Sequence, residues 1–240
     1  MISTRVIGRL LDYPDGDLFR HHQELIAALE TASELNLQHS LRLVQFISEF
    51  CSRPLLDVQA EYCELFDRGR ATSLLLFEHV HGESRDRGQA MVDLMEQYRA
   101  DGLVLDSKEL PDFLPLYLEY LGSGSPERAR SGLQDIVPIL ALLAARLQQR
   151  QSPYAVLFDA LLSLSGSEVE PDALQVQVEK EARDDTPAAL DAVWEEEQIK
   201  FLGEQGCVSA QQAAHQRRFS GAVAPQYLDV AEATKRSKGH

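Results

Sequence analysis

The sequence predicts an all-α protein, a single-domain helical bundle of about ten helices with a flexible C-terminal tail. Apolar residues recur with the 3.6-residue period of a helix wherever a pattern is clear, and strand signals are scarce. A further observation is a helix start signal that occurs three times, a polar capping residue followed by proline. Proline is favourable there because its missing amide hydrogen is not needed in the first helical turn. The three pairs are Ser125 with Pro126, Ser152 with Pro153, and Thr186 with Pro187.

The expected helices follow one another between proline and glycine breaks. The first comes after Pro14 and has an apolar face from Leu18 to Leu29. The later helices cover Leu41 to Cys51, Pro54 to about Gly69, Ser84 to about Tyr98, Pro111 to Leu121, and Pro126 to about Gln149 with a kink at Pro138, and two more begin at Pro153 and Pro187. Residues 71–83 follow no clear period, so the local sequence leaves their structure open.

Charge changes sign near the end of the chain. Residues 179–204 contain nine acidic and three basic residues, a net charge of −6, whereas residues 205–240 contain two acidic and five basic residues, a net charge of +3. The second stretch is also poorly periodic. We therefore expect residues 1–203 to form the all-helical domain and residues 204–240 to form a basic, partly disordered tail.

The composition, with 44% hydrophobic and 25% charged residues, is typical of a folded protein. The formal net charge of −15 argues against nucleic-acid binding, which needs a basic surface, and favours a basic partner, although acidity also simply maintains solubility. Three cysteines without a CxxC pair indicate neither a disulfide framework nor a zinc ribbon. Arg9 and Asp12 interrupt any signal-peptide core, and the most apolar run, Ile136 to Ala145, is shorter than the ~20 residues of a membrane span. We expect a cytoplasmic protein without direct membrane insertion.

The segment from Tyr62 to Met91 is the best candidate for a binding site. Its apolar run, residues 74–77, is flanked on both sides by dense mixed charge, which does not suit an ordinary surface helix. His79, His81 and Glu83 also suggest a metal-dependent hydrolase, but they make no complete ligand set and the HExxH spacing is absent. The strings GxSxG, GxGxxG and GxxxxGK[ST] are absent as well. We therefore expect no enzyme activity, no metal site and no cofactor.

Three long and unusual strings point to a family. They are SLLLFEHVHGESRDRGQAM from Ser73 to Met91, ELPDFLPLYLEYL from Glu109 to Leu121, and DDTPAALDAVWEEEQIK from Asp184 to Lys200. They closely resemble the nitrate reductase delta-subunit family, part of a wider group of all-helical chaperones that mature molybdenum-containing redox enzymes. The similarity extends from the first helix to VAPQYL at residues 223–228.

The wider group has two motifs that this chain resembles. An aromatic-x-x-Leu-Phe motif is matched by Tyr62, Leu65 and Phe66. A Glu-Pro-x-Asp-His type motif is matched in part, from Glu109 to Phe113, with Leu110 in place of proline and Phe113 in place of histidine. Any role that the group assigns to that histidine therefore does not transfer to this chain.

The resemblance implies a system-specific chaperone that binds the N-terminal segment of the nitrate reductase catalytic (alpha) subunit. Binding would be transient, would involve the alpha–beta apoenzyme, and would keep it competent for molybdenum cofactor insertion before membrane attachment. The chaperone would not be part of the final enzyme. Family members bind a twin-arginine-like leader or its remnant, and the acidity of this chain suits such a basic peptide.

We expect the partner segment to dock as an amphipathic helix in an apolar groove with acids at its rim. The groove would contain Tyr62, Phe66, Leu76, Phe77 and Tyr117, and the rim would contain Glu78, Glu83, Glu109 and Asp112. His79 and His81 would tune release, because their charge changes near neutral pH. The alternative for each apolar residue is an ordinary core position. A generic helical adaptor and the metal-dependent hydrolase are the alternative functions.

Overall fold

The computed structural model describes residues 1–81, 86–105, 109–167, 174–175, 178–192 and 194. Contacts divide the chain into two units, residues 1–190 and residues 191–240, and almost all described residues belong to the first. The expected domain boundary between residues 203 and 204, and the expected tail, lie outside the described residues and stay predictions. None of the helices in the described ranges has both the length and the apolarity needed to cross a bilayer.

The described part of the first unit is built from eleven α-helices and one π-helical segment, which confirms the predicted all-α fold class. They are α1 (Ile2–Leu11), α2 (Gly16–Arg20), α3 (His22–Thr31), α4 (Leu37–Cys51), α5 (Leu55–Tyr62), the π-helical segment η1 (Cys63–Asp67), α6 (Leu76–His81), α7 (Asp86–Ala100), α8 (Leu114–Ser123), α9 (Pro126–Asp135), α10 (Val137–Gln149) and α11 (Ala155–Ser165). The only β pairing among the described residues is an isolated antiparallel bridge between Leu75 and Phe113.

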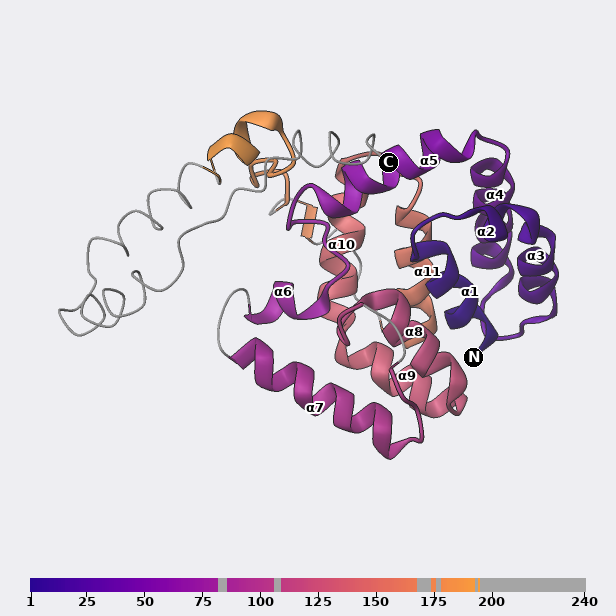
Figure 1. The fold of residues 1–240 in the computed structure, drawn as a ribbon. Helices are drawn as coiled ribbons and strands as arrows, with labels where there is room; N and C mark the ends of the chain where they lie inside the picture. Colours follow the sequence, from indigo (N-terminus) through magenta and orange to yellow (C-terminus); the bar gives the residue numbers. More distant parts are fainter. Residues whose placement is uncertain (82–85, 106–108, 168–173, 176–177, 193, 195–240) are drawn as a thin grey trace, which may run out of the picture. The chain divides into compact units, whose positions relative to one another are not determined.

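Two helix pairs organise the core. Helix α1 packs extensively against α8, and α10 against α11. Gly8 lets α1 approach closely, since a Cβ at this position would lie 3.1 Å from the Pro115 carbonyl oxygen. Leu118 of α8 and Phe158 of α11 are completely buried in this core. Figure 1 shows α10 and α11 between α1–α4 on one side and α6 and α7 on the other. Helix α8 is therefore anchored on one face by α1.

The predicted start signals are confirmed where a side chain caps the helix directly. The Ser125 hydroxyl accepts a hydrogen bond from the backbone N–H three residues later, at 3.3 Å, and opens α9. The Thr186 hydroxyl does the same at 3.2 Å, and residues 187–192 are helical. Ser152 precedes α11 by three residues, so this third pair marks a turn before the helix.

Three expected helices begin or break at other residues. Pro111 does not open a helix: it lies in a turn, and α8 begins at Leu114. The helix expected from residue 126 to residue 149 is interrupted at Ile136, and Pro138 lies in the first turn of α10. Proline there removes a backbone hydrogen bond, so the chain starts a new helix instead of kinking one. The apolar face from residue 18 to residue 29 is likewise divided between α2 and α3 at His21.

Candidate functional site

A hollow of about 510 Å³ lies between α1, α3 and α8, and we name it the α1 hollow. Its apolar lining consists of Ile2, Val6, Gly8, Leu25, Ala28, Phe113, Pro115 and Leu116. Its charged lining consists of Arg5, Arg9, Asp12, Glu109 and Glu119. A mainly apolar depression with a few charged groups at its edge is the usual composition of a ligand-binding site.

Two further hollows lie next to the α1 hollow and share lining residues with it. The π-helix hollow, about 410 Å³, lies beside η1 and shares Glu109 and Phe113 with the α1 hollow. The tyrosine hollow, about 310 Å³, lies beside Tyr98 and Tyr120. It shares with the α1 hollow two residues of α8, at positions 116 and 119. The shared residues place the three hollows next to one another beside α8, and we name this row of hollows the α8 groove.

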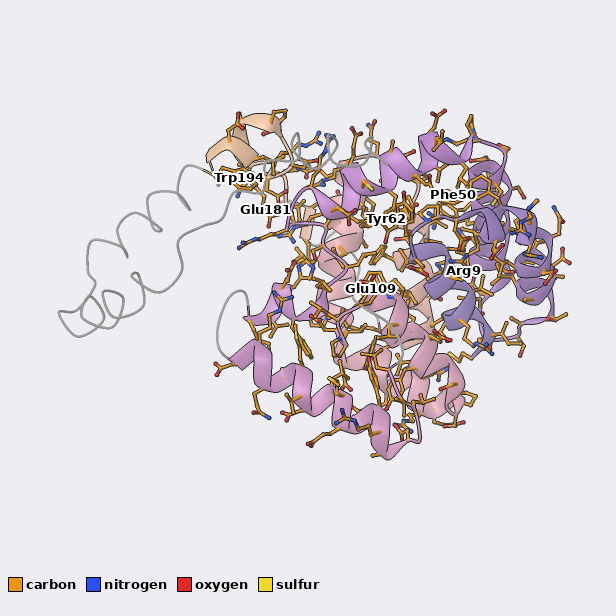
Figure 2. The ribbon with its side chains drawn as sticks, viewed as in Figure 1. Arg9, Phe50, Tyr62, Glu109, Glu181 and Trp194 are labelled. Atoms are coloured by element: carbon orange, nitrogen blue, oxygen red, sulfur yellow. The ribbon has the colours of Figure 1, made fainter. Side chains whose placement is uncertain are left out.

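The α8 groove follows α8 along its whole length. Phe113 is the N-cap of the helix, and Ser123, its last residue, lines the tyrosine hollow. Ten helical residues at 1.5 Å per residue span about 15 Å, so the groove is long enough for about ten residues of a docked helix. In Figure 2, Glu109 lies below Tyr62 and to the left of Arg9, and it lines the π-helix hollow together with Tyr62 and the α1 hollow together with Arg9.

Charges along the α8 groove are mixed, and several are paired within the chain. Arg9 lies 2.5 Å from Asp15, and Arg68 lies 3.3 Å from the glutamate four residues earlier. Glu109 and Glu119 are exposed carboxylates at the two junctions between hollows. The groove is therefore not uniformly acidic, and a matching segment would be mainly apolar with basic groups near these two positions.

Tyr62 and Phe66 form the buried floor of the π-helix hollow. Their ring centroids are 4.9 Å apart, and both rings pack against Tyr154, with centroids 6.3 Å and 5.0 Å away. The Tyr62 hydroxyl donates a hydrogen bond of 2.9 Å to the Leu11 carbonyl, which ties α5 to α1, and burial raises the pKa of Tyr62. Both rings are about 5% exposed or less, so they support the hollow more than they face it.

The loop of residues 69–73 contributes Gly69, Arg70 and Ser73 to the wall of the π-helix hollow, and it is held by Arg146 of α10 and by Arg150, which directly follows α10. Arg146 donates a hydrogen bond of 2.8 Å to the Ala71 carbonyl. Arg150 donates one of 3.0 Å to the Thr72 hydroxyl, and that hydroxyl in turn donates to a carbonyl of η1. The wall is thus fixed from α10 on one side and from η1 on the other.

An acidic segment, residues 181–185, completes the attachment of this wall. Glu181 receives two hydrogen bonds from the Arg146 guanidinium, at 2.8 Å and 3.0 Å. Arg150 lies 3.2 Å from Asp184 and 3.3 Å from Asp185, and both Arg150 and Asp185 are largely buried. The family-like string that begins at Asp184 therefore has a structural role next to the groove.

Asp112 is not at a rim, and the expectation that placed it there is wrong. Its side chain is completely buried. Oδ2 accepts a hydrogen bond of 3.0 Å from the Phe77 N–H and lies 3.9 Å from the Arg87 guanidinium, and Oδ1 has no hydrogen-bond partner among the described residues. Burial raises the pKa of Asp112, although the Phe77 N–H and Arg87 act in the opposite direction. The carboxylate caps the start of α6 and ties it to the segment before α8.

His79 of the predicted site contacts a backbone carbonyl. His79 Nε2 lies 2.8 Å from the Ser73 carbonyl oxygen. Burial lowers the pKa of His79 and nearby Arg146 lowers it further, although the hydrogen bond to Ser73 opposes both. Within the described ranges no three His, Cys, Asp or Glu side chains gather as metal ligands. Glu83, the third residue of the hydrolase hypothesis, lies outside those ranges.

Comparison with known proteins decides the family. Residues 24–160 match the model of the family described as "Nitrate reductase delta subunit". The chain belongs to this family. The resemblance predicted from the sequence is therefore confirmed.

Three relatives of this delta-subunit family member are named as assembly chaperones. It is 58% identical to the "Nitrate reductase molybdenum cofactor assembly chaperone NarJ" of Escherichia coli (strain K12) over 230 residues, 96% of this chain and 98% of that protein. It is 52% identical over 232 residues to the "Probable nitrate reductase molybdenum cofactor assembly chaperone NarW" of the same organism, 96% of this chain and 97% of that protein. A Bacillus subtilis (strain 168) relative named as a NarJ chaperone is 30% identical over 162 residues, 68% of this chain and 87% of that protein.

The predicted groove is divided between two separate hollows of this delta-subunit fold. Tyr62, Phe66, Glu78 and Glu109 line the π-helix hollow. Leu76, Phe77, His81 and Tyr117 line a hollow of about 380 Å³ between α6, α7, α8 and the α9–α10 junction, which we name the α7 hollow. His79 and Asp112 line neither of them, and Glu83 lies outside the described residues. The expectation of one groove is wrong because α6 begins at Leu76 and turns successive side chains to different sides.

The half of the α8 groove formed by α1 and α3 was not predicted. Ile2 and Val6 belong to α1, which was not among the helices expected from the sequence, and Leu25 belongs to a helix whose sequence shows an apolar face but not the element that the face meets. The sequence does indicate the α8 side of the groove, because Phe113 and Leu116 are three residues apart and so lie on the same side of the chain in a helical turn. The missing information was the long-range packing of α1 on α8.

Proposed function

We propose that this chain is a chaperone for molybdenum cofactor assembly of nitrate reductase, and that its α8 groove binds the N-terminal segment of the catalytic (alpha) subunit. The partner is the alpha–beta apoenzyme, which is bound transiently in the cytoplasm and kept competent for cofactor insertion before membrane attachment. The chaperone is not part of the finished enzyme. The full-length similarity to relatives that are named as such chaperones supports the assignment.

The observation that carries the proposal is the row of neighbouring hollows along α8, which share lining residues. Phe113 and Leu116 are only half-buried, and both line the mainly apolar α1 hollow. A peptide helix with an apolar face would cover these side chains along the ~15 Å length of the groove. Helix-in-groove recognition of this kind obtains its affinity from the buried apolar side chains.

Carboxylates at the junctions between the hollows would set the direction of the bound helix. Glu109 and Glu119 are exposed and stand at successive points along α8. Basic side chains of the segment would meet them, which fixes orientation and accelerates association more than it adds affinity. The Glu78 carboxylate, which also lines the π-helix hollow, pairs with Arg87 at 3.2 Å.

Occupation of the groove explains how a protein without a catalytic site can control assembly. A segment that lies in the groove is covered, so the same segment is unavailable for membrane attachment until it dissociates. The balance between bound and free apoenzyme then follows the chaperone concentration relative to the dissociation constant. Chaperone action of this kind requires only selective binding of the unfinished enzyme.

A calorimetric titration with the catalytic subunit's N-terminal peptide tests the groove. Leu116→Ser removes an apolar contact shared by the α1 and tyrosine hollows, and we expect it to weaken binding about tenfold, the equivalent of ~1.4 kcal/mol. Leu56→Ser is the matched control, because Leu56 of α5 is 78% exposed and lines none of the three hollows. If Leu116→Ser folds and binds the peptide as tightly as the control does, the groove is not the site.

A generic helical adaptor would also offer an apolar groove, so the identity of the partner needs its own test. The tagged chain is used to capture proteins from nitrate-respiring cells. The proposal requires the nitrate reductase catalytic subunit to be the main protein recovered, and Leu116→Ser to reduce its recovery. Recovery of a varied set of unrelated proteins would favour the adaptor.

A further inference from the structure

A short acidic stretch, residues 178–185, lies against α10 and against the loop of residues 69–73. We name the first the acidic strap and the second the wall loop. Val178, at the start of the strap, is 1% exposed, and its carbonyl accepts a hydrogen bond of 3.1 Å from the Gln149 side chain. Val178 is also the only large apolar residue of the strap. The remaining attachment of the strap is therefore polar and ionic.

Asp184 joins the acidic strap to the wall loop. Its Oδ2 accepts a hydrogen bond of 2.7 Å from the Ala71 N–H, and its Oδ1 accepts one of 3.2 Å from the Arg150 guanidinium. Hydrogen bonds to a carboxylate from a backbone N–H and from a guanidinium are stronger than those between neutral groups. One side chain of the strap thus holds the backbone of the wall loop and the end of α10 together.

Gly69 leaves the space that this carboxylate occupies. A Cβ atom at position 69 would lie 2.6 Å from Asp184 Oδ1 and 2.8 Å from Oδ2, which is closer than non-bonded contact allows. Gly69 does not have a positive φ angle, so its backbone conformation is open to other residues. The absence of a side chain at Gly69, and not its backbone freedom, is therefore what lets Asp184 reach the wall loop.

The wall loop connects the acidic strap to the π-helix hollow. Three of its residues line the hollow. Within the loop the Thr72 hydroxyl donates a hydrogen bond to the Leu65 carbonyl of η1. Displacement of Asp184 would leave the Ala71 N–H without its acceptor and would loosen this side of the hollow.

We infer that the acidic strap is a latch on the π-helix hollow: with Asp184 seated against Gly69 the wall loop is ordered and the hollow is preformed, and when the strap detaches both loosen together. A segment attached by few apolar side chains opens locally at a lower free energy than global unfolding. A ligand that needs the preformed hollow favours the closed latch, and by linkage the closed latch favours the ligand by the same factor. The identity of that ligand rests on the proposed function, whereas the latch does not.

Hydrogen exchange of the full chain, measured by mass spectrometry and corrected for intrinsic rates, tests the latch without any ligand. Gly69→Ala should displace the Asp184 carboxylate and accelerate exchange in the wall loop and the acidic strap about tenfold, the equivalent of ~1.4 kcal/mol. Asp184→Ala should do the same. The double variant should exchange no faster than either single variant, because the carboxylate that Gly69→Ala displaces is then already absent.

Gly88→Ala and Glu179→Ala are the matched controls. A Cβ atom at position 88 would meet no atom within 4 Å, and Glu179 is an exposed acid of the same strap. We expect both controls to exchange like the natural chain, and exchange in the buried helix α11 to be the same in every variant. The inference is overturned if Gly69→Ala does not accelerate exchange, if its effect adds to that of Asp184→Ala, or if α11 accelerates equally, which would mean global unfolding.

The N-terminal peptide of the catalytic subunit then tests the coupling of the latch to a ligand. No residue of the acidic strap lines the π-helix hollow, so slower exchange in the strap reports coupling and not direct contact. At a peptide concentration that calorimetry shows to be saturating, we expect exchange in the strap of the natural chain to slow at least fivefold. A peptide that binds without slowing this exchange would overturn the inference and leave the proposed function intact. Absence of peptide binding, with the variants behaving as expected, would refute the proposed function and leave the latch intact.

Discussion

Asp112 offers a sharp test of how α6 is attached to the start of α8. We predict that Asp112→Ala lowers the free energy of unfolding by about 2–4 kcal/mol, whereas Asp112→Asn lowers it by less than about 1 kcal/mol. Both substitutions remove the charge. Only alanine removes the acceptor for the Phe77 N–H, which Oδ2 holds at 3.0 Å.

The two magnitudes follow from the surroundings of the carboxylate. Alanine leaves the Phe77 N–H without an acceptor, which costs about 1–3 kcal/mol, and creates a small cavity at a completely buried position. Asparagine keeps a carbonyl oxygen for that N–H and removes a buried charge. Arg87 loses little in either variant, because Asp112 is 3.9 Å away whereas Glu78 pairs with Arg87 at 3.2 Å.

The pH dependence of the asparagine variant has a defined sign. Burial raises the pKa of Asp112 in the folded protein above its unfolded value of about 3.9, so the folded state binds this proton more tightly. The stability that the protonated carboxyl contributes is present below the unfolded pKa and is lost as the pH rises through the folded pKa. The stability of Asp112→Asn relative to the natural chain should therefore increase between pH 4 and pH 7.

Urea unfolding followed by far-UV circular dichroism at both pH values measures these differences. The reasoning is refuted if Asp112→Asn is as destabilising as Asp112→Ala at pH 7. It is also refuted if the relative stability of the asparagine variant falls as the pH rises. Either result would mean that the charge of Asp112, and not its acceptor oxygen, holds α6.

Two further substitutions test the attachments around the π-helix hollow, both by urea unfolding. Tyr62→Phe removes the hydrogen bond from the hydroxyl to α1 and should lower the free energy of unfolding by about 1 kcal/mol. Tyr13→Phe, at an exposed ring, should not change the free energy of unfolding. Equal stability of the two variants would mean that the Tyr62 hydroxyl does not tie α5 to α1. Arg150→Met leaves the buried Asp185 carboxylate with one cation fewer and should lower the free energy of unfolding by about 2–3 kcal/mol. Arg20→Met, at an exposed ion pair, should lower it by less than about 0.5 kcal/mol. Similar losses in both variants would mean that burial of the Arg150–Asp185 pair does not increase its contribution to stability.

Elements with local capping signals could be predicted from the sequence. Ser125 caps α9 as expected, because the hydrogen bond joins residues only three positions apart. Pro111 was misassigned because the residue that follows it, Asp112, is used to cap α6, which is 35 positions away in sequence. Such a contact leaves no periodic trace in the local sequence.

The candidate site was predicted only in part, for the same reason. The sequence indicated Tyr62, Phe66 and Glu109 as candidate site residues, and all three line the π-helix hollow. It could not show that Phe77, one position after the buried Leu76, faces a different hollow. Nor could it show that α1 completes the groove, since α1 meets α8 through long-range packing in which Gly8 lies close to Pro115.

The molybdenum content of the nitrate reductase catalytic subunit tests the proposed function most directly. The subunit is purified from cells that contain the natural chain, Leu116→Ser or Leu56→Ser in place of their own chaperones, and metal is measured by mass spectrometry. We predict a full complement of molybdenum with the natural chain and with Leu56→Ser, and a severely reduced content with Leu116→Ser present at the same level. A full complement with Leu116→Ser, or in cells without any form of the chain, would contradict the account.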